Sequence, residues 1–302
     1  MLRPFALHRP SSLGEIADLL DAHGDEAALY AGGTELLLLM KEGLLRPRHL
    51  IDVKRVAGLD ALTAGADGTL TIGAAVPHRA IETSPIVRER VPLLGRVARH
   101  VANARVRAVG TVGGNLAFAD PHSDLATVLL TLDTTVQLWS RRGERVLPLA
   151  DFIRDAYETA RAEDEVLTAV RLHPWPAGTA AAYVKFGIYE RPTLGVAVAL
   201  VPVAGRDSVS LRLAIGCVGP RPQRLGAIER QAEEQAPGRL AARADELAAD
   251  AARAVEPVDD RHGSAEYKRE MTRVFVRRAL QAAVGRAEGR EPDARYAYTV
   301  LV

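Results

Sequence analysis

Hydrophobic positions in the first part of the chain alternate between two spacings. Short apolar runs at residues 5–8, 27–31 and 49–53 have the character of strands, and the strand at 27–31 is expected to be buried. Between the first two, apolar residues recur every three or four positions over 13–23, with Ser11 or Ser12 as the N-cap and Gly24 as the stop. A second helical stretch carries 36–40 and stops near Gly43. This β-α-β-α-β order predicts a small parallel sheet.

The middle of the chain mixes hairpin signals with helical stretches. Runs 62–64 and 70–73 flank Asp67-Gly68, and runs 134–140 and 145–149 flank Arg142-Gly143, so each pair predicts a hairpin. Helices are predicted over 77–82, 93–103 and 124–132, with a turn at Ser84-Pro85. Residues 166–172 again resemble a strand.

A proline-rich segment, 173–176, precedes a change of pattern. Strands are predicted at 182–186, 193–203 and 209–215, and the remainder is helical over 227–255 and 263–287. We therefore place a domain boundary after residue 176 and predict two domains, 1–176 and 177–302.

Composition and charge narrow the class of protein. The 302 residues are 48% hydrophobic and 25% charged, as in ordinary globular proteins, and are sufficient for two cores. Lysine plus arginine is 39 against 38 acidic residues, and the two signs are interleaved, which gives no sign of nucleic-acid binding. No apolar run approaches the roughly 20 residues that span a bilayer, and the N-terminal segment lacks a signal-peptide core. A cytoplasmic location is expected.

Several common kinds of site are unsupported by the sequence. With one cysteine, Cys217, the chain can form no internal disulfide and no four-thiolate iron–sulfur cluster, and we expect this thiol to be buried. Dinucleotide-binding G-x-G-x-x-G after a strand, P-loop, H-E-x-x-H and G-x-S-x-G motifs are all missing. His100, His122 and His173 are scattered, and we expect each to be a surface or satisfied polar residue.

Two glycine pairs are the most informative motifs. Gly32-Gly33 follows the second predicted strand, and Gly113-Gly114 follows a short apolar approach at Val106 and Val109. A glycine pair permits positive φ and leaves amide N–H groups pointing outward, and such concave amides bind phosphates. Two such turns, each between strand-like and helix-like segments, fit one ligand with two phosphates. A dinucleotide is the natural candidate.

Asp124 starts the helix that leads away from the second glycine pair. An acidic residue there is common as an N-cap or first-turn residue, because it stabilises the positive end of the helix. A carboxylate at this point could equally accept hydrogen bonds from a ribose diol. The sequence position leaves both interpretations open.

Taken together, these segments resemble the FAD-binding middle subunit of the molybdenum hydroxylases, the family that contains carbon monoxide dehydrogenase and xanthine dehydrogenase. The resemblance covers nearly the whole chain. It is carried by F-A-L-H-R-P-S at 5–11, A-G-G-T-E-L-L-L-L-M-K at 31–41, T-V-G-G-N-L-A-F-A-D-P-H-S-D-L at 111–125, 165–174, Y-V-K-F at 183–186 and A-E-Y-K-R-E-M-T-R-V-F-V-R-R-A at 265–279.

The resemblance implies an α+β fold, with two α/β subdomains that hold FAD and a C-terminal domain of small antiparallel sheet plus helices. It also implies a set of FAD-binding residues around the two motifs. The set comprises Ala31, Gly32, Gly33, Thr34, Glu35 and Leu36 with Thr111, Val112, Gly113, Gly114 and Asn115 at the pyrophosphate, Asp124 at the ribose, Leu167 and Lys185 at the adenosine or flavin portion, and Val101.

The implied chemistry is electron transfer within a complex. A large subunit would carry molybdopterin, a small subunit two [2Fe–2S] clusters, and two such heterotrimers would pair. The single cysteine fits this division, since the clusters cannot be in this chain.

Two positions depart from the family pattern. Thr34-Glu35 stands where the carbon monoxide dehydrogenase type has His-Ser, which weakens a specific carbon monoxide assignment. Tyr189 is a candidate to shield the flavin ring. A stand-alone FAD oxidase or reductase and a scaffold with empty glycine turns are the alternatives.

Overall fold

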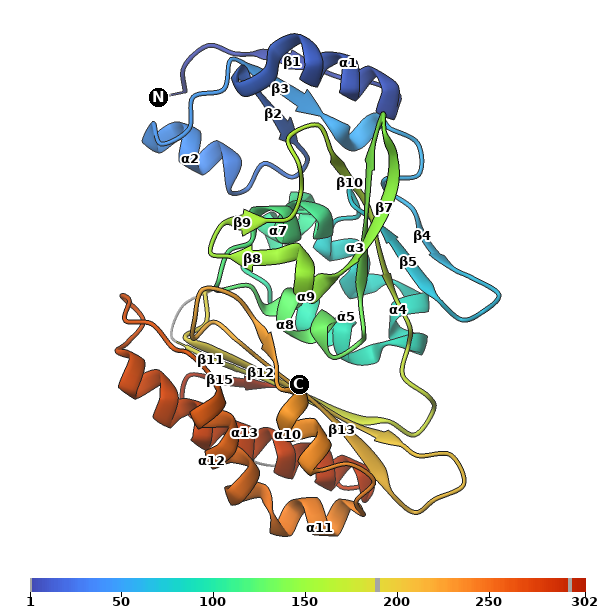
Figure 1. The fold of residues 1–302 in the computed structure, drawn as a ribbon, viewed down its shortest axis with the longest axis vertical. Helices are drawn as coiled ribbons and strands as arrows, with labels where there is room; N and C mark the ends of the chain where they lie inside the picture. Colours follow the sequence, from blue (N-terminus) through green and yellow to red (C-terminus); the bar gives the residue numbers. More distant parts are fainter. Residues whose placement is uncertain (1, 188–190, 293–294) are drawn as a thin grey trace.

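The computed structural model describes residues 2–187, 191–292 and 295–302. Three larger sheets follow one another with their helices along the long axis of the molecule (Figure 1), and the described residues form one further sheet of two short strands. An N-terminal sheet lies at one end, a central sheet in the middle and a C-terminal sheet at the other end. Within the described ranges, no helix is both long and apolar enough to cross a membrane.

The N-terminal sheet is parallel, in the order β1-β3-β2, as the hydrophobic pattern predicted. The hydroxyl of Ser12 caps the first helix by accepting from the Glu15 amide, and Gly24 ends it. Ile16 and Ile51 pack fully buried between helix and sheet. The elements are β1 Ala6–His8, α1 Leu13–His23, β2 Ala27–Tyr30, α2 Leu36–Glu42 and β3 His49–Asp52, with 3-10 turns at Gly24–Glu26 and Val53–Arg55.

The central sheet is antiparallel, in the order β4-β5-β10-β6-β7. Both predicted hairpins are confirmed, and β10 lies between them and joins them into one sheet. The strands are β4 Leu62–Ala64, β5 Leu70–Gly73, β6 Thr135–Ser140, β7 Gly143–Pro148 and β10 Val166–Leu172.

Seven short helices accompany the central sheet within the described residues, and two sequence-based predictions are corrected here. The turn predicted at Ser84-Pro85 starts a helix, because Ser84 Oγ accepts from the Val87 amide and proline suits the first helical position. The approach to the second glycine pair is also a helix, capped by Asn103, since two valines three residues apart fit a helix face as well as a strand. The elements are α3 His78–Thr83, α4 Pro85–Arg90, α5 Pro92–Ala98, α6 Ala104–Val109, α7 Val112–Phe118, α8 Asp124–Leu130, α9 Leu149–Phe152, β8 Ile153–Asp155 and β9 Glu158–Thr159.

The C-terminal sheet is antiparallel, in the order β14-β13-β12-β11-β15, and confirms the three predicted strands. The helical stretch predicted over 227–255 is divided into three helices, and Pro237 begins the second of them. The elements are β11 Ala180–Phe186, β12 Leu194–Pro202, β13 Val209–Gly216, β14 Gln223–Arg224, α10 Gly226–Gln231, α11 Pro237–Ala242, α12 Ala244–Ala254, α13 Ala265–Ala287 and β15 Thr299–Leu301.

Strand β12 is buried on both faces, which explains its continuous apolar run. Ala197 and Ala199 belong to the central core with Leu129 of α8, whereas Val196 and Val198 belong to the core under α12 and α13. The C-terminal sheet is therefore packed between two layers of helices.

The domain division at residue 176 remains a prediction. Cys217 is buried, as expected.

Candidate functional site

A cleft of about 720 Å³ lies between the N-terminal sheet and the central helices, large enough for a cofactor. All the predicted cofactor-binding residues line it except Val112, which is buried, and Lys185, which lies behind the wall. The lining members are Ala31, Gly32, Gly33, Thr34, Glu35, Leu36, Val101, Thr111, Gly113, Gly114, Asn115, Asp124 and Leu167. The fold thus brings together two motifs that are about eighty residues apart in the sequence.

The two glycine motifs touch each other at Gly32. A Cβ on this residue would lie 2.3 Å from the carbonyl oxygen of Val109 and 2.6 Å from Cα of Gly110. These are backbone atoms, which cannot move aside as a flexible side chain would. Gly32 is therefore required because one backbone passes directly against another.

The first motif presents free amides, as predicted. Gly33 has φ of +69°, and the amide N–H groups of Gly32, Gly33, Thr34 and Glu35 make no hydrogen bond to the part of the chain that the structure describes. The ammonium of Lys54 holds the start of this loop, since it donates to Ala31 O at 2.8 Å. Consecutive free amides of this kind form a concave anion site.

The second motif differs from the prediction. Gly113 and Gly114 have no positive φ but form the first turn of α7, whose N-cap is Thr111. Their amides are already used: Gly113 donates to Ala74 O at 2.9 Å and Gly114 to Thr111 Oγ1 at 3.1 Å. Gly113 has another reason to be glycine, because its Cβ would lie 2.5 Å from Cβ of Ala74. The expected positive-φ turn with free amides is therefore wrong here.

Asp124 takes part in a buried ion pair. Its Oδ2 accepts from Lys185 Nζ at 2.7 Å and its Oδ1 from the Tyr183 hydroxyl at 2.8 Å, while Lys185 also donates to His100 O. Burial raises the pKa of the Asp124 carboxyl, and the Lys185 ammonium and Tyr183 hydroxyl oppose this by favouring the charged form. Ser123 is the N-cap of α8, so Asp124 is a first-turn residue of that helix.

Arg191 is a cleft residue that the sequence analysis missed. One nitrogen of its guanidinium contacts Glu35 Oε2 at 2.8 Å and Asp120 Oδ2 at 3.2 Å. It therefore links Glu35, which follows the first glycine pair, to Asp120, which follows α7. No local pattern marks this residue, since its two partners lie far away in the sequence. Tyr189, the residue considered for shielding a flavin ring, lies outside the described residues.

His78 is a second residue that the sequence analysis missed. It lines the cleft at only 3% exposure, and its Nδ1 has no hydrogen-bond partner in the described ranges. Burial lowers the pKa of His78 to about 4, so the ring is neutral at neutral pH.

Comparisons with known proteins agree with this geometry. Residues 3–175 match the family described as the FAD binding domain in molybdopterin dehydrogenase, and residues 190–283 match the CO dehydrogenase flavoprotein C-terminal domain. The chain therefore belongs to the family of FAD-binding flavoproteins of molybdopterin dehydrogenases. Within it, the chain is an FAD-binding medium subunit of the molybdenum hydroxylase type, and its homologues are oxidoreductases.

Individual relatives are similar along nearly their whole length. The carbon monoxide dehydrogenase medium chain of Hydrogenophaga pseudoflava is 34% identical, over 93% of this chain and 98% of that protein. The nicotine 6-hydroxylase medium subunit of Paenarthrobacter nicotinovorans is 32% identical, over 92% and 96%. A solved structure of the Hydrogenophaga carbon monoxide dehydrogenase, lacking the Mo-pyranopterin moiety, matches with a TM-score of 0.87 over 95% of this chain and 99% of the matched one. The resemblance inferred from the sequence is confirmed.

Proposed function

We propose that this chain transfers electrons within a molybdenum hydroxylase, from [2Fe–2S] clusters of a partner subunit to an external acceptor. The observation that carries the proposal is the row of free amides from Gly32 to Glu35 at the edge of the cleft. Bound FAD would supply the redox chemistry, since a flavin exchanges electrons singly or in pairs. The protein's own contribution is to bind, orient and shield this cofactor.

The residues divide the binding task unequally. The free amides of the first motif bind the pyrophosphate. The second motif forms the opposite wall of the cleft, and Thr111 and Asn115 are the polar residues of that wall. Val101 and Leu167 supply apolar surface to the adenosine or flavin portion. Asp124 lines the cleft, where it could accept from the ribose while held by Lys185. Lys185 then acts by positioning Asp124.

The partners follow from what this chain lacks. One cysteine cannot supply the four thiolates of an iron–sulfur cluster, so we assign the clusters to a partner subunit. The family resemblance assigns them to a small subunit and molybdopterin to a large one. Relatives are named medium chains or medium subunits, which supports a complex of three kinds of subunit. We further propose a dimer of such heterotrimers in the cytoplasm. Relatives named for carbon monoxide, nicotine and glyceraldehyde share this subunit type, which supports selection of the substrate by the large subunit.

Anaerobic reconstitution tests the proposal. The isolated FAD-loaded chain, mixed with candidate substrates, should keep an oxidised flavin spectrum. Addition of the large and small subunits should bleach the flavin when substrate is added. Bleaching in the isolated chain would instead support the stand-alone flavin oxidase or reductase. If the purified chain took up no FAD, the result would instead support a scaffold whose glycine turns are empty.

A further inference from the structure

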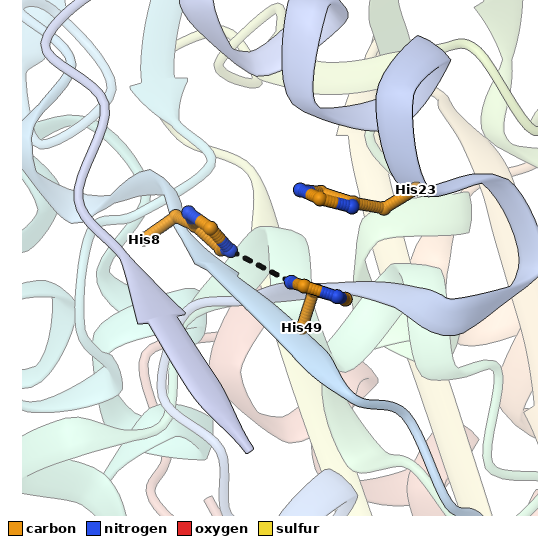
Figure 2. Close-up of side chains that lie close together, drawn as sticks. All are labelled: His8, His23 and His49. Carbon is orange, nitrogen blue, oxygen red and sulfur yellow. Dashed lines mark hydrogen bonds between the residues drawn. The ribbon is translucent and has the colours of Figure 1, made fainter.

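Three histidines from three separate elements meet on the surface of the N-terminal sheet (Figure 2). His8 ends β1, His23 ends α1 and His49 begins β3, and each is partly exposed. One ring nitrogen from each lies within 4.8 Å of those of the other two. They are 15 and 26 residues apart in the sequence, so no local motif marks them.

The fold fixes this meeting point. In the parallel pairing of β1 with β3, Ala6 lies opposite His49 and His8 opposite Ile51. Because side chains two apart on a strand point to the same face, His8 and His49 share one face of the sheet. Gly24 ends α1 by donating to Leu20 O, which leaves His23 as the last helical residue beside that face.

Two contacts hold the three rings together. His8 Nε2 and His49 Nδ1 lie 2.9 Å apart in a hydrogen bond, so one ring nitrogen donates and the other accepts. The rings of His23 and His49 stack with centroids 3.6 Å apart and planes 7° from parallel. The ring nitrogen that accepts the hydrogen bond carries a lone pair, which is the group that binds a metal.

We propose that His8, His23 and His49 form a binding site for one divalent transition-metal ion of the zinc type. Imidazole nitrogen is a ligand for Zn²⁺, Cu²⁺ and Ni²⁺, whereas Mg²⁺ and Ca²⁺ require oxygen ligands, which this set does not include. Three protein ligands leave a fourth position for water. The partial exposure of all three rings provides the entry path.

Binding requires a local rearrangement. Stacked parallel rings direct their lone pairs along parallel planes, so His23 or His49 must rotate about its Cβ–Cγ bond to converge on one ion. The hydrogen bond between His8 and His49 is exchanged for two metal–nitrogen bonds, and the proton on the donating nitrogen moves to the other nitrogen of the same ring. The bound ion then ties the end of α1 to both β1 and β3. Because Gly24 and Asp25 directly after His23 line the cleft, the ion also braces a cleft wall.

Calorimetric titration with Zn²⁺ tests the site. The protein should be the full chain without an affinity tag, loaded with FAD and freed of metal by a chelator. We expect saturable binding of one Zn²⁺ per chain and a rise in the midpoint of thermal unfolding, since an ion that binds only the folded state stabilises it. Mg²⁺ at the same concentration should give neither signal.

Variants assign the ligands. His49→Ala and His23→Gln should each abolish the saturable step and the thermal shift, with FAD content unchanged. His23→Gln keeps a polar side chain at a partly exposed helix end, so it should fold even if His49→Ala does not. His173→Ala is the matched control and should retain both signals, because His173 directly follows β10 of the central sheet, where its ring nitrogen contacts Thr69. Absence of saturable binding in the wild type, or its persistence in both cluster variants, would overturn the site.

Discussion

The two glycine motifs share a Gly-Gly pair and face the same cleft, yet their backbones differ. In the first, Gly33 has positive φ and four successive amides are free. In the second, Gly113 and Gly114 are helical, and their amides donate to Ala74 and Thr111. The first motif is therefore a set of donors for a ligand. The second is a helix start at which Gly113 packs too closely against Ala74 for any side chain.

The difference teaches that a glycine pair has two physical uses. One is access to positive φ, which exposes amides, and the other is the absence of a Cβ. Gly32 belongs to the first motif but serves the packing use. Because it has no Cβ, the first motif can lie against Val109 and Gly110, the residues just before the second motif. Substitutions can separate donor function from packing function.

The largest effect is expected from Gly32→Val. The new side chain would collide with backbone atoms of Val109 and Gly110, so the two motifs must move apart and the row of amides is displaced. We expect FAD occupancy to fall more than tenfold, measured as the flavin-to-protein absorbance ratio after gel filtration. Gly238→Ala, where a Cβ meets nothing within 4 Å, is the control and should retain full flavin. Full occupancy in Gly32→Val would contradict the cleft assignment.

The next effect is the loss of stability at low pH that we expect from the buried side chain of His78. This residue lies beneath the second motif, where its backbone amide donates to Gly110 O. The unfolded ring takes up a proton near pH 6.5, whereas the folded ring does so only near its pKa of about 4. The unfolded state therefore binds more protons between these values, and stability falls as pH falls through them. We expect a loss of about 3 kcal/mol for the flavin-free chain.

Urea unfolding at several pH values measures the His78 contribution. His78→Gln cannot titrate in this range, so its stability should decline less steeply between pH 7 and pH 4 than that of the wild type. Identical slopes for the two proteins would show that other groups cause the acid sensitivity.

Gly113→Ala tests the packing role of the second motif. Its Cβ would lie 2.5 Å from Cβ of Ala74 and 2.7 Å from Ala74 O, so the start of α7 must move away from the central sheet. We expect a loss of about 1–3 kcal/mol in the free energy of unfolding, typical of an overpacked core. Chemical denaturation measures it, and unchanged stability would show that the contact relaxes without cost.

The smallest effect is expected from Gly114→Ala. Its Cβ would approach only Thr111 Oγ1, at 2.9 Å, and alanine favours the helix that glycine weakens. We expect stability to change by less than about 1 kcal/mol and FAD occupancy to remain within twofold. If FAD binding were instead lost, a phosphate must approach this residue closely, and the second motif would regain a donor role.

The sequence by itself determined the elements and the family. The alternation of spacings predicted the parallel N-terminal sheet, both hairpins and the strands of the C-terminal sheet, because burial on one or two faces imposes a period on the residues themselves. Short helices were predicted less well: α4 begins at a proline that also suits a turn, and α6 carries too few apolar positions to establish a period.

Only the tertiary structure decided which residues distant in the sequence contact each other. The amides of the second motif are used by Ala74, the carboxylate of Asp124 by Tyr183 and Lys185, and Arg191 joins Glu35 to Asp120. The meeting of three histidines is of the same kind. Local spacing encodes which face of an element is buried, but the partner across that face is chosen by the packing of whole elements. An amide or carboxylate is therefore free or occupied according to a neighbour that its own segment does not specify.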